Sequence, residues 1–148
     1  ADGADTINFL VRLNKGSNEG EIHKVSSGGE LSRLMLAINL VIAQSINRKT
    51  LIFDEVDSGV SGAVSEAIGI RLLDLSNYQQ VFTVTHLPQV ASRGNKHFIA
   101  IKNERDGVTY TSVKELSEKE RADEIAKMIS GNVVTEEAIM LSNKLLKK

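Results

Sequence analysis

The segment Thr50-Leu51-Ile52-Phe53-Asp54-Glu55 gives the strongest indication of how the chain folds. Its apolar part is short and continuous, and it ends at two acids. Runs of this kind are typical of strands that are buried on both faces, as in a parallel sheet. We therefore expect a strand at residues 50–53, with the carboxylates of Asp54 and Glu55 at its carboxyl end.

A second apolar run, Val81-Phe82-Thr83-Val84-Thr85, ends in a similar way at His86. Between the two runs, apolar residues recur at helical spacing over residues 64–75. A strand, a helix and a strand in this order predict a βαβ crossover, in which the two strands are parallel. Because ligands gather at the carboxyl edge of such sheets, we expect Asp54, Glu55 and His86 to share one edge.

A long helix is expected before this unit. From Leu31 to Ile46 apolar residues recur every three or four positions, and others widen the stripe, so most of this helix is expected to be buried. Ser27-Gly28-Gly29-Glu30 stands directly before it. Adjacent glycines let a bulky anion approach the backbone, and a helix start offers free N–H groups, so the segment is a candidate phosphate site. The alternative is that Ser27 is an ordinary N-cap and the glycines are loop.

The outer segments predict smaller elements. Residues 6–13 alternate as in a strand with one buried face, and residues 14–21 have the composition of an exposed loop. Pro88 opens a short helical turn, and residues 97–103 and 108–113 flank Asp106-Gly107, a strong hairpin signal. Two more helices are expected, one over residues 118–129 after a Ser117–Glu120 capping box and ending at Gly131, the other over residues 136–146.

These elements predict an α/β fold: a mainly parallel sheet flanked by helices, with an antiparallel hairpin as a wing. The 148 residues, of which 41% are hydrophobic, fit a single domain over residues 1–148. The chain has no cysteine, which excludes disulfides and zinc–thiolate sites. No apolar run approaches the roughly 20 residues of a membrane span, and the polar start does not resemble a signal peptide. We expect a cytoplasmic protein without a membrane partner.

Three side chains are candidates for phosphate chemistry. Asp54 has the hard oxygen ligands that Mg²⁺ prefers, and Glu55 is placed to accept a proton from an attacking water. His86 is a candidate hydrogen-bond donor to a terminal phosphate or a catalytic water. The alternatives are a pair of solvated acids and a structural histidine. The 18 basic and 19 acidic residues nearly cancel, so composition alone does not indicate a nucleic-acid binder.

The order of these motifs resembles the C-terminal lobe of ABC- and SMC-type ATPase heads, which are P-loop NTPases. The matches are Ser27-Gly28-Gly29-Glu30 to the signature motif, Ile52-Phe53-Asp54-Glu55 to Walker B, Asp57-Ser58-Gly59-Val60-Ser61 to the D-loop, and His86 to the switch histidine. Residues 26–33, 53–62, 85–91 and 121–131 are similar to the bacterial RecN family, whose members are SMC-related and act in DNA double-strand-break repair and recombination. The resemblance covers most of residues 21–146.

The resemblance implies that two complete heads enclose two ATP molecules with Mg²⁺. Residues 27–30 of one head would cap the γ-phosphate of ATP bound by the other, and Ser58 and Gly59 would also lie at the nucleotide. Asp54 would hold the metal, while Glu55 and His86 would be catalytic. The implied partners are an N-terminal Walker A lobe of the same protein, a second copy in a homodimer, and DNA through a nucleoid-associated full-length assembly.

One motif of such heads is missing from the chain. No Gly-x-x-x-x-Gly-Lys-Ser/Thr loop occurs, and Gly16 and Gly20 have the wrong spacing and no following lysine. We therefore expect a C-terminal piece that is inactive as an isolated lobe. Three alternatives stay open: another SMC- or ABC-type lobe, a metal-dependent nuclease or phosphohydrolase built on Asp54, Glu55 and Asp57, and a non-enzymatic docking module.

Overall fold

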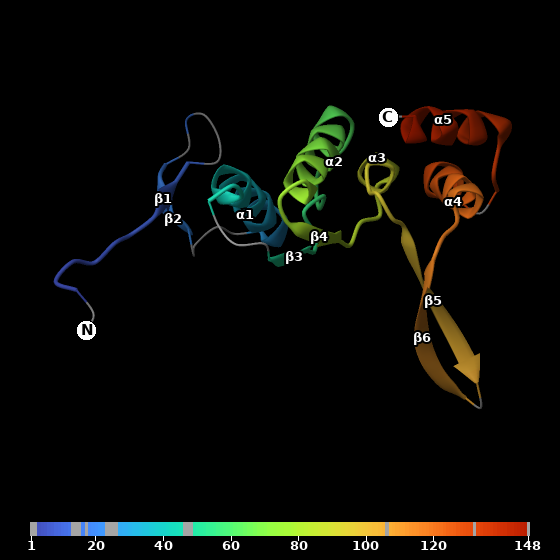
Figure 1. The fold of residues 1–148 in the computed structure, drawn as a ribbon, viewed down its shortest axis with the longest axis horizontal. Coiled ribbons are helices and arrows are strands. Elements are labelled where there is room, and N and C mark those ends of the chain that lie inside the picture. Colours follow the sequence, from blue (N-terminus) through green and yellow to red (C-terminus); the bar gives the residue numbers. More distant parts are fainter. Residues whose placement is uncertain are drawn as a thin grey trace.

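The computed structural model describes residues 3–12, 16, 18–22, 27–45, 49–105, 107–131 and 133–147. The helices lie along one side of the molecule and most of the strands along the other, while the first strand pair lies beside the first helix (Figure 1). The elements follow in the order β1 (Leu10–Val11), β2 (Gly20–Glu21), α1 (Gly28–Ile42), β3 (Thr50–Phe53), α2 (Ala63–Ser76), β4 (Gln80–Thr83), α3 (Pro88–Ala91), β5 (Phe98–Arg105), β6 (Val108–Glu115), α4 (Glu118–Ser130) and α5 (Glu136–Leu146).

The predicted βαβ unit is confirmed. β3 and β4 pair in parallel, with Thr50 opposite Gln80 and Phe53 opposite Thr83, and α2 connects them. The pairing continues one residue further, because the backbone N–H of Val84 donates to the carbonyl oxygen of Phe53 at 3.0 Å. The carboxyl ends of both strands therefore lie at the same edge of the sheet.

The main core lies between α1, α2, α3 and the covered face of this strand pair. Burial of these apolar side chains is the main favourable term for folding. The buried members are Leu36, Ala43, Phe53, Val56, Ile68, Leu72, Leu75 and Val90.

The expectation that both sheet faces are buried is wrong. In the described residues the helices cover one face, and the other leaves Ile52 73% exposed and Phe82 and Val84 also exposed. The long helix is less buried than expected as well: Val41 is 81% exposed, and only Gly29 and Leu36 of α1 are buried. It begins at Gly28 rather than Leu31 and ends at Ile42, while Ile46 lies outside the described residues.

The amino-terminal segment forms less structure than its pattern predicts. β1 has two residues and pairs antiparallel with β2, so part of the expected loop is a strand. Ile7 and Phe9 are exposed, which contradicts the predicted buried face of a strand over residues 6–13. Leu13 lies outside the described residues.

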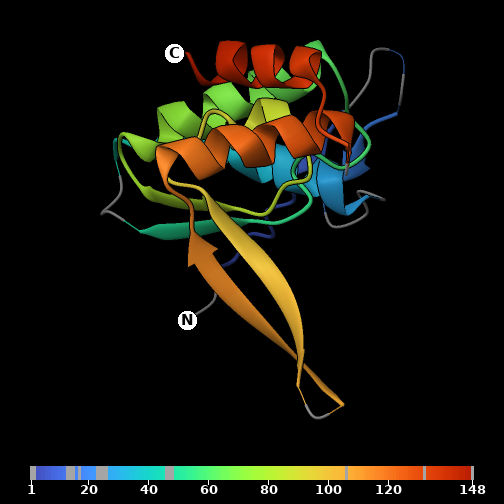
Figure 2. The same cartoon turned by 90° about the vertical axis from the view of Figure 1, so that its right-hand side faces the viewer.

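The predicted hairpin is confirmed and longer than expected. β5 and β6 pair antiparallel over their whole lengths and extend away from the helices (Figure 2). Gly107 is described, whereas Asp106, the other residue of the turn signal, lies outside the described residues. The short helix at Pro88 is also present, as α3.

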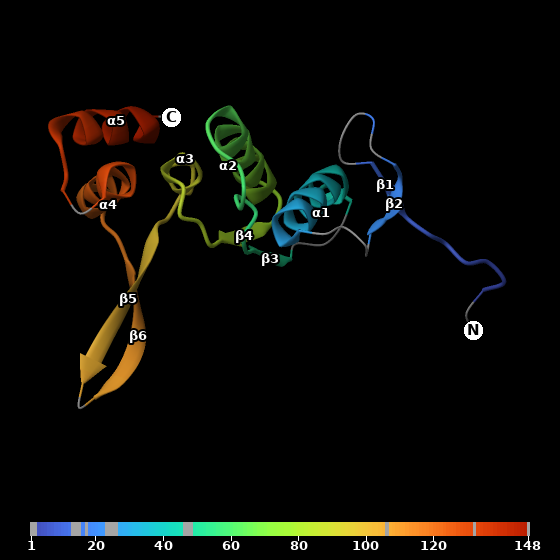
Figure 3. The same cartoon turned by 180° about the vertical axis from the view of Figure 1, so that it is seen from behind.

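The carboxyl-terminal helices pack on each other beyond the hairpin (Figure 3). Ser117 and Glu120 form the predicted capping box of α4, and hydrogen bonds from Lys114 and Ser117 lower the pKa of Glu120 to about 2. α5 turns Ala138 and Ser142 toward α4, and the Ser142 hydroxyl donates to the Ala122 carbonyl at 3.0 Å.

These elements confirm the α/β class: the residues that the structure describes form one parallel strand pair and two antiparallel ones. None of the helices in the described ranges has the length and apolar character needed to cross a bilayer.

Two positions of α2 give a test of the core. Leu75 is fully buried, and Leu75→Ala should lower the free energy of unfolding by about 2–5 kcal/mol because it leaves a cavity. Val64 lies on the same helix but is exposed, so Val64→Ala should change the free energy of unfolding by no more than about 0.5 kcal/mol. Urea unfolding of both variants measures the difference, and equal losses would contradict the position of α2.

Candidate functional site

The first turn of α1 is built from the Ser-Gly-Gly-Glu motif. Ser27 has extended backbone angles, and its hydroxyl accepts a hydrogen bond from the Glu30 backbone N–H at 3.1 Å. The N-cap interpretation of Ser27 is therefore confirmed. The glycines are not loop, however, because Gly28 and Gly29 are the first two residues of the helix. Their free N–H groups lie at the positive end of the helix dipole.

The two glycines allow this turn to contact the loop that follows β3. A Cβ atom on Gly28 would lie 3.0 Å from Glu55 Oε2. A Cβ on Gly29 would lie 3.0 Å from the backbone oxygen of Glu55 and 3.1 Å from Ser58 Cβ. Any larger residue at position 29 therefore meets backbone that cannot easily move. The structure thus brings the Ser-Gly-Gly-Glu motif and the Asp-Glu motif into direct contact within one chain.

Side chains from the next turn of α1 hold the same loop. The Ser32 hydroxyl donates to the carbonyl oxygen of Asp54 at 2.9 Å. Nη1 of Arg33 donates to the carbonyl oxygens of Val56, at 3.3 Å, and of Ser58, at 2.9 Å. Each bond satisfies a backbone oxygen of a segment that has left the sheet. Ser32 and Arg33 therefore position the acidic loop through its backbone.

Glu55 has an unusual backbone conformation. Its φ of 57° makes it the one non-glycine residue with positive φ in the part of the chain that the structure describes. A non-glycine residue in this region costs about 1–3 kcal/mol and persists where the surroundings impose it, commonly at functional sites. The Ser58 N–H donates to the Glu55 carbonyl at 3.0 Å and closes the turn. The side chains of Asp54 and Glu55 remain exposed at the sheet edge.

Asp57 is separated from these two acids. It is 2% exposed, and one of its carboxylate oxygens accepts a hydrogen bond from the hydroxyl of Thr85. Among the described residues no group of three or more metal-ligating side chains is placed to hold a metal ion. The nuclease alternative built on Asp54, Glu55 and Asp57 is therefore not supported. Asp57 instead joins the acidic loop to the segment after β4.

His86 lies at the same sheet edge, beyond the end of β4. Its side chain is exposed. Both neighbouring residues are held by hydrogen bonds: the Thr85 hydroxyl donates to the Asp57 carboxylate, and the Leu87 backbone N–H donates to the Thr85 hydroxyl at 3.0 Å. Ser58 and Gly59 are exposed in the turn after Glu55. Among the predicted residues, those in 27–30 therefore contact the loop of residues 54–58. His86 lies at the same sheet edge.

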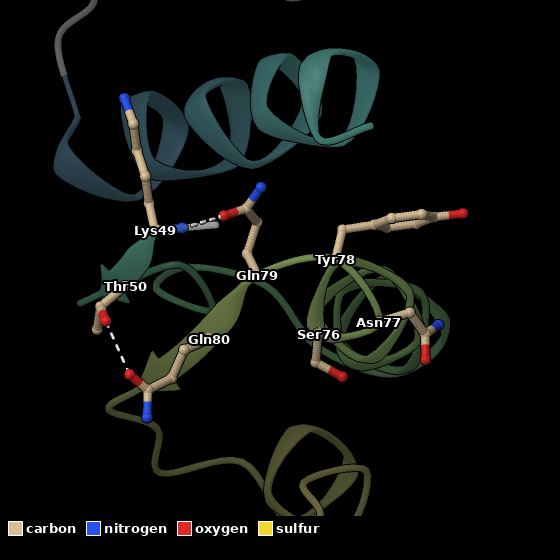
Figure 4. A pocket seen from close by; sticks show the side chains of 7 residues that line it. All are labelled: Lys49, Thr50, Ser76, Asn77, Tyr78, Gln79 and Gln80. Carbon is tan, nitrogen blue, oxygen red and sulfur yellow. Dashed lines mark hydrogen bonds between the residues drawn. The ribbon is translucent and has the colours of Figure 1, made fainter. Parts of the chain in front are cut away.

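A hollow of about 440 Å³ lies elsewhere, at the amino ends of β3 and β4 (Figure 4). Its polar groups bond to one another: Thr50 donates to Gln80 at 2.7 Å, and the Lys49 N–H donates to the side-chain oxygen of Gln79. The amide of Gln79 also donates to the Ala43 carbonyl at 3.2 Å. This hollow lies between the carboxyl end of α2 and the amino ends of the two strands, on the edge opposite to the candidate site.

The donor set at the acidic edge fits Mg²⁺ that arrives with a nucleotide. Magnesium bound with phosphates takes one or two carboxylates from the protein and keeps water on its other positions. Asp54 and Glu55 are exposed carboxylates at the edge where such ligands bind in α/β sheets. The first turn of α1 adds backbone donors for an anion.

Known proteins with similar sequences are RecN proteins. No protein-family model matches the chain. DNA repair protein RecN of Rickettsia conorii is 40% identical over 146 residues, RecN of Bacillus subtilis 43% over 146, and RecN of Vibrio cholerae 41% over 144. These alignments cover 97–99% of this chain but 25–27% of the relatives. The chain therefore spans about a quarter of the length of the curated relatives that it matches.

A solved structure from work on the ATP-driven dimerization and DNA-stimulated activation of SMC ATPases has a similar fold. The TM-score is 0.50 at 24% identity, over 80% of this chain and 70% of that one. This match shows that the chain has a fold similar to that of an SMC ATPase. In sequence the chain is RecN-like over nearly its whole length.

Sequence reasoning missed the residues that assemble the site. Ser32, Arg33 and Thr85 bind no predicted ligand, yet they fix the positions of the acids. A signal for the first two exists: they are polar side chains at the start of a helix whose next residues are mostly apolar. No comparable signal marks Thr85, which continues a run of strand-forming residues.

The two glycines of α1 give a matched test of this contact. Gly29→Ala should lower the free energy of unfolding by about 1–3 kcal/mol, because the added methyl meets the Glu55 backbone. Gly28→Ala meets only the mobile end of the Glu55 side chain and gains about 0.5–1 kcal/mol of helix preference. In chemical unfolding, the free energy of unfolding of Gly28→Ala should therefore be clearly higher than that of Gly29→Ala. The reverse order would contradict the close approach at Gly29.

Proposed function

We propose that residues 1–148 form one lobe, the C-terminal signature-bearing lobe of the ATPase head of a RecN-like protein. In this proposal the complete head binds ATP and Mg²⁺, pairs with a second head around the nucleotides, and hydrolyses ATP. The observation that supports it most is the direct contact of the first turn of α1 with the Glu55 loop. This contact keeps an anion-binding helix start and two exposed carboxylates at a fixed separation.

Each candidate residue has a distinct role in the proposed site. Asp54 holds Mg²⁺, and Glu55 accepts a proton from the water that attacks the γ-phosphate. His86 hydrogen-bonds the γ-phosphate or that water. The turn of residues 27–30 caps the γ-phosphate of ATP bound to the second head, with Ser58 and Gly59 beside it. Mg²⁺ supplies neutralisation of charge on the phosphates.

The partners follow from the surface and from the relatives. The uncovered sheet face with Ile52, Phe82 and Val84 supports a Walker A lobe of the same protein as the segment packed on it, since large apolar patches are rarely left in water. The relatives are named for DNA repair, and the solved neighbour for ATP-driven dimerization and DNA-stimulated activation. We infer that the complete protein to which this chain belongs forms a homodimer, contacts DNA, and has a cytoplasmic, nucleoid-associated location.

By itself the chain should have negligible ATPase activity. The backbone cradle and lysine of a Walker A loop provide most of the contact with the β- and γ-phosphates, and this sequence contains no such loop. Phosphate release from ATP by the purified chain should therefore equal the rate without protein. Turnover that Glu55→Gln abolishes would contradict this division of labour.

In the complete protein, three substitutions separate the roles. Glu55→Gln keeps the size of the side chain but removes the base, so ATP binding and dimerization should persist while hydrolysis falls about a hundredfold or more. Asp54→Asn should already weaken Mg²⁺-dependent nucleotide binding. Ser27→Arg places a bulky side chain where the second head must approach, so it should block dimerization and leave binding to single heads nearly normal.

Equilibrium nucleotide binding, sedimentation with and without ATP, and steady-state hydrolysis measure these outcomes. Glu104→Gln, on an exposed position of β5, is the control for loss of a carboxylate and should behave as wild type. If Ser27→Arg protein still dimerizes on ATP, residues 27–30 are only a helix start, and the role across the dimer is wrong.

A further inference from the structure

Arg121, in the first turns of α4, is a buried charge outside the candidate site. The side chain is 5% exposed, and its Nη2 donates to three carbonyl oxygens: Ser92 at 2.8 Å, Gly94 at 2.5 Å and Ala91 at 3.4 Å. These oxygens belong to the end of α3 and the turn that follows it. Carbonyls at a helix end have no partner within the helix, and a cation there also interacts favourably with the dipole.

Burying a guanidinium is expensive, and here the fit is incomplete. The Nε atom of Arg121 is buried without a hydrogen-bond partner. Such an arrangement is weak support for stability, since buried charges are often replaceable by well-packed apolar residues. What this side chain provides is a defined position for α3, because its Nη2 group binds three oxygens at the end of that helix and the turn after it.

α3 is also held from its other side. A Cβ on Gly69 of α2 would lie 3.1 Å from the Gln89 oxygen and 3.3 Å from Val90 Cα, so the two helices touch through their backbones. Arg93, just after α3, pairs with Glu66 of α2 at 2.9 Å. α3 therefore lies between α2 and α4 with contacts on both sides.

The amino end of α3 leads directly to His86. Leu87 is the N-cap of α3, and its N–H donates to the Thr85 hydroxyl, which in turn donates to buried Asp57. His86 stands between these two anchored residues. A continuous series of contacts thus runs from α4 through Arg121 and α3 to His86 and the acidic loop.

We propose that Arg121 is a positioning residue for His86. Its hydrogen bonds hold the carboxyl end of α3 against α4, and α3 in turn determines where His86 lies at the sheet edge of the candidate site. The inference rests on the proposed function, in which His86 contacts the γ-phosphate or the attacking water. Arg121 itself touches neither. Its loss therefore affects the chemical step more than nucleotide binding, since a displacement of about 1 Å at a reacting group lowers rates up to about a hundredfold.

The test uses the complete protein with Arg121→Met and the milder Arg121→Lys, which keeps the charge but lacks the planar fork. We expect kcat to fall about ten- to a hundredfold in Arg121→Met and less in Arg121→Lys, with ATP binding and ATP-driven dimerization near wild type. Hydrogen exchange should become faster in residues 85–94. Arg71→Met is the matched control, because Arg71 forms an exposed ion pair with Asp74 on α2, and it should change none of these.

A double-mutant cycle with His86→Ala distinguishes positioning from general damage. If Arg121 acts through His86, Arg121→Met lowers kcat no further when His86 is already alanine. Two results would overturn the inference and leave the proposed function intact. One is that Arg121→Met lowers kcat in the His86→Ala protein as much as it does in the wild type. The other is that hydrogen exchange at residues 85–94 is unchanged in Arg121→Met. Wild-type kcat in His86→Ala alone would overturn the proposed role of His86, and this inference with it. Arg121→Lys supplies the same comparisons if Arg121→Met does not fold.

Discussion

The contact between the first turn of α1 and the loop after β3 is the interaction on which the rest of the site depends. Two glycines allow the helix to approach the Glu55 backbone, and Ser32 and Arg33 bind the carbonyl oxygens of Asp54, Val56 and Ser58. The contact also explains how Glu55 holds its positive φ, since strain of this kind persists where neighbours impose it. The positions of both acids are therefore set by the helix that begins at the Ser-Gly-Gly-Glu segment.

This contact has a consequence for a paired head. In the proposed site, Glu55 acts on the ATP of its own head, whereas residues 27–30 act on the ATP of the other. Because both are parts of one packed unit, movement of the helix start shifts the acidic loop as well. Asp57 and Thr85 extend the same unit to the segment of His86, so the candidate residues of one edge belong to one set of hydrogen bonds.

Part of this structure was predictable because local patterns determine it. The two apolar runs and the helix between them define the βαβ unit, and Ser117 with Glu120 marks the start of α4. Exposure was not predictable for Ile52 or Ile7, since an apolar pattern does not say which segment covers a face. Asp57 does not lie with Asp54 and Glu55, because the chain leaves the strand after Phe53 and turns: residues 54–55 are exposed, and residues 56–57 are buried. The roles of Arg33 and Arg121 depend on contacts with residues more than 20 positions away, which no local pattern encodes.

In the proposed function, the α1 turn and the acidic loop act as one unit that faces two nucleotides. A structure of the complete protein carrying Glu55→Gln, determined with ATP and Mg²⁺, tests it directly. We expect Mg²⁺ at Asp54, residues 27–30 of the second copy at the γ-phosphate, and unchanged hydrogen bonds from Ser32 and Arg33 to the acidic loop. A nucleotide whose γ-phosphate meets neither Asp54 nor the α1 turn of the second copy would contradict it.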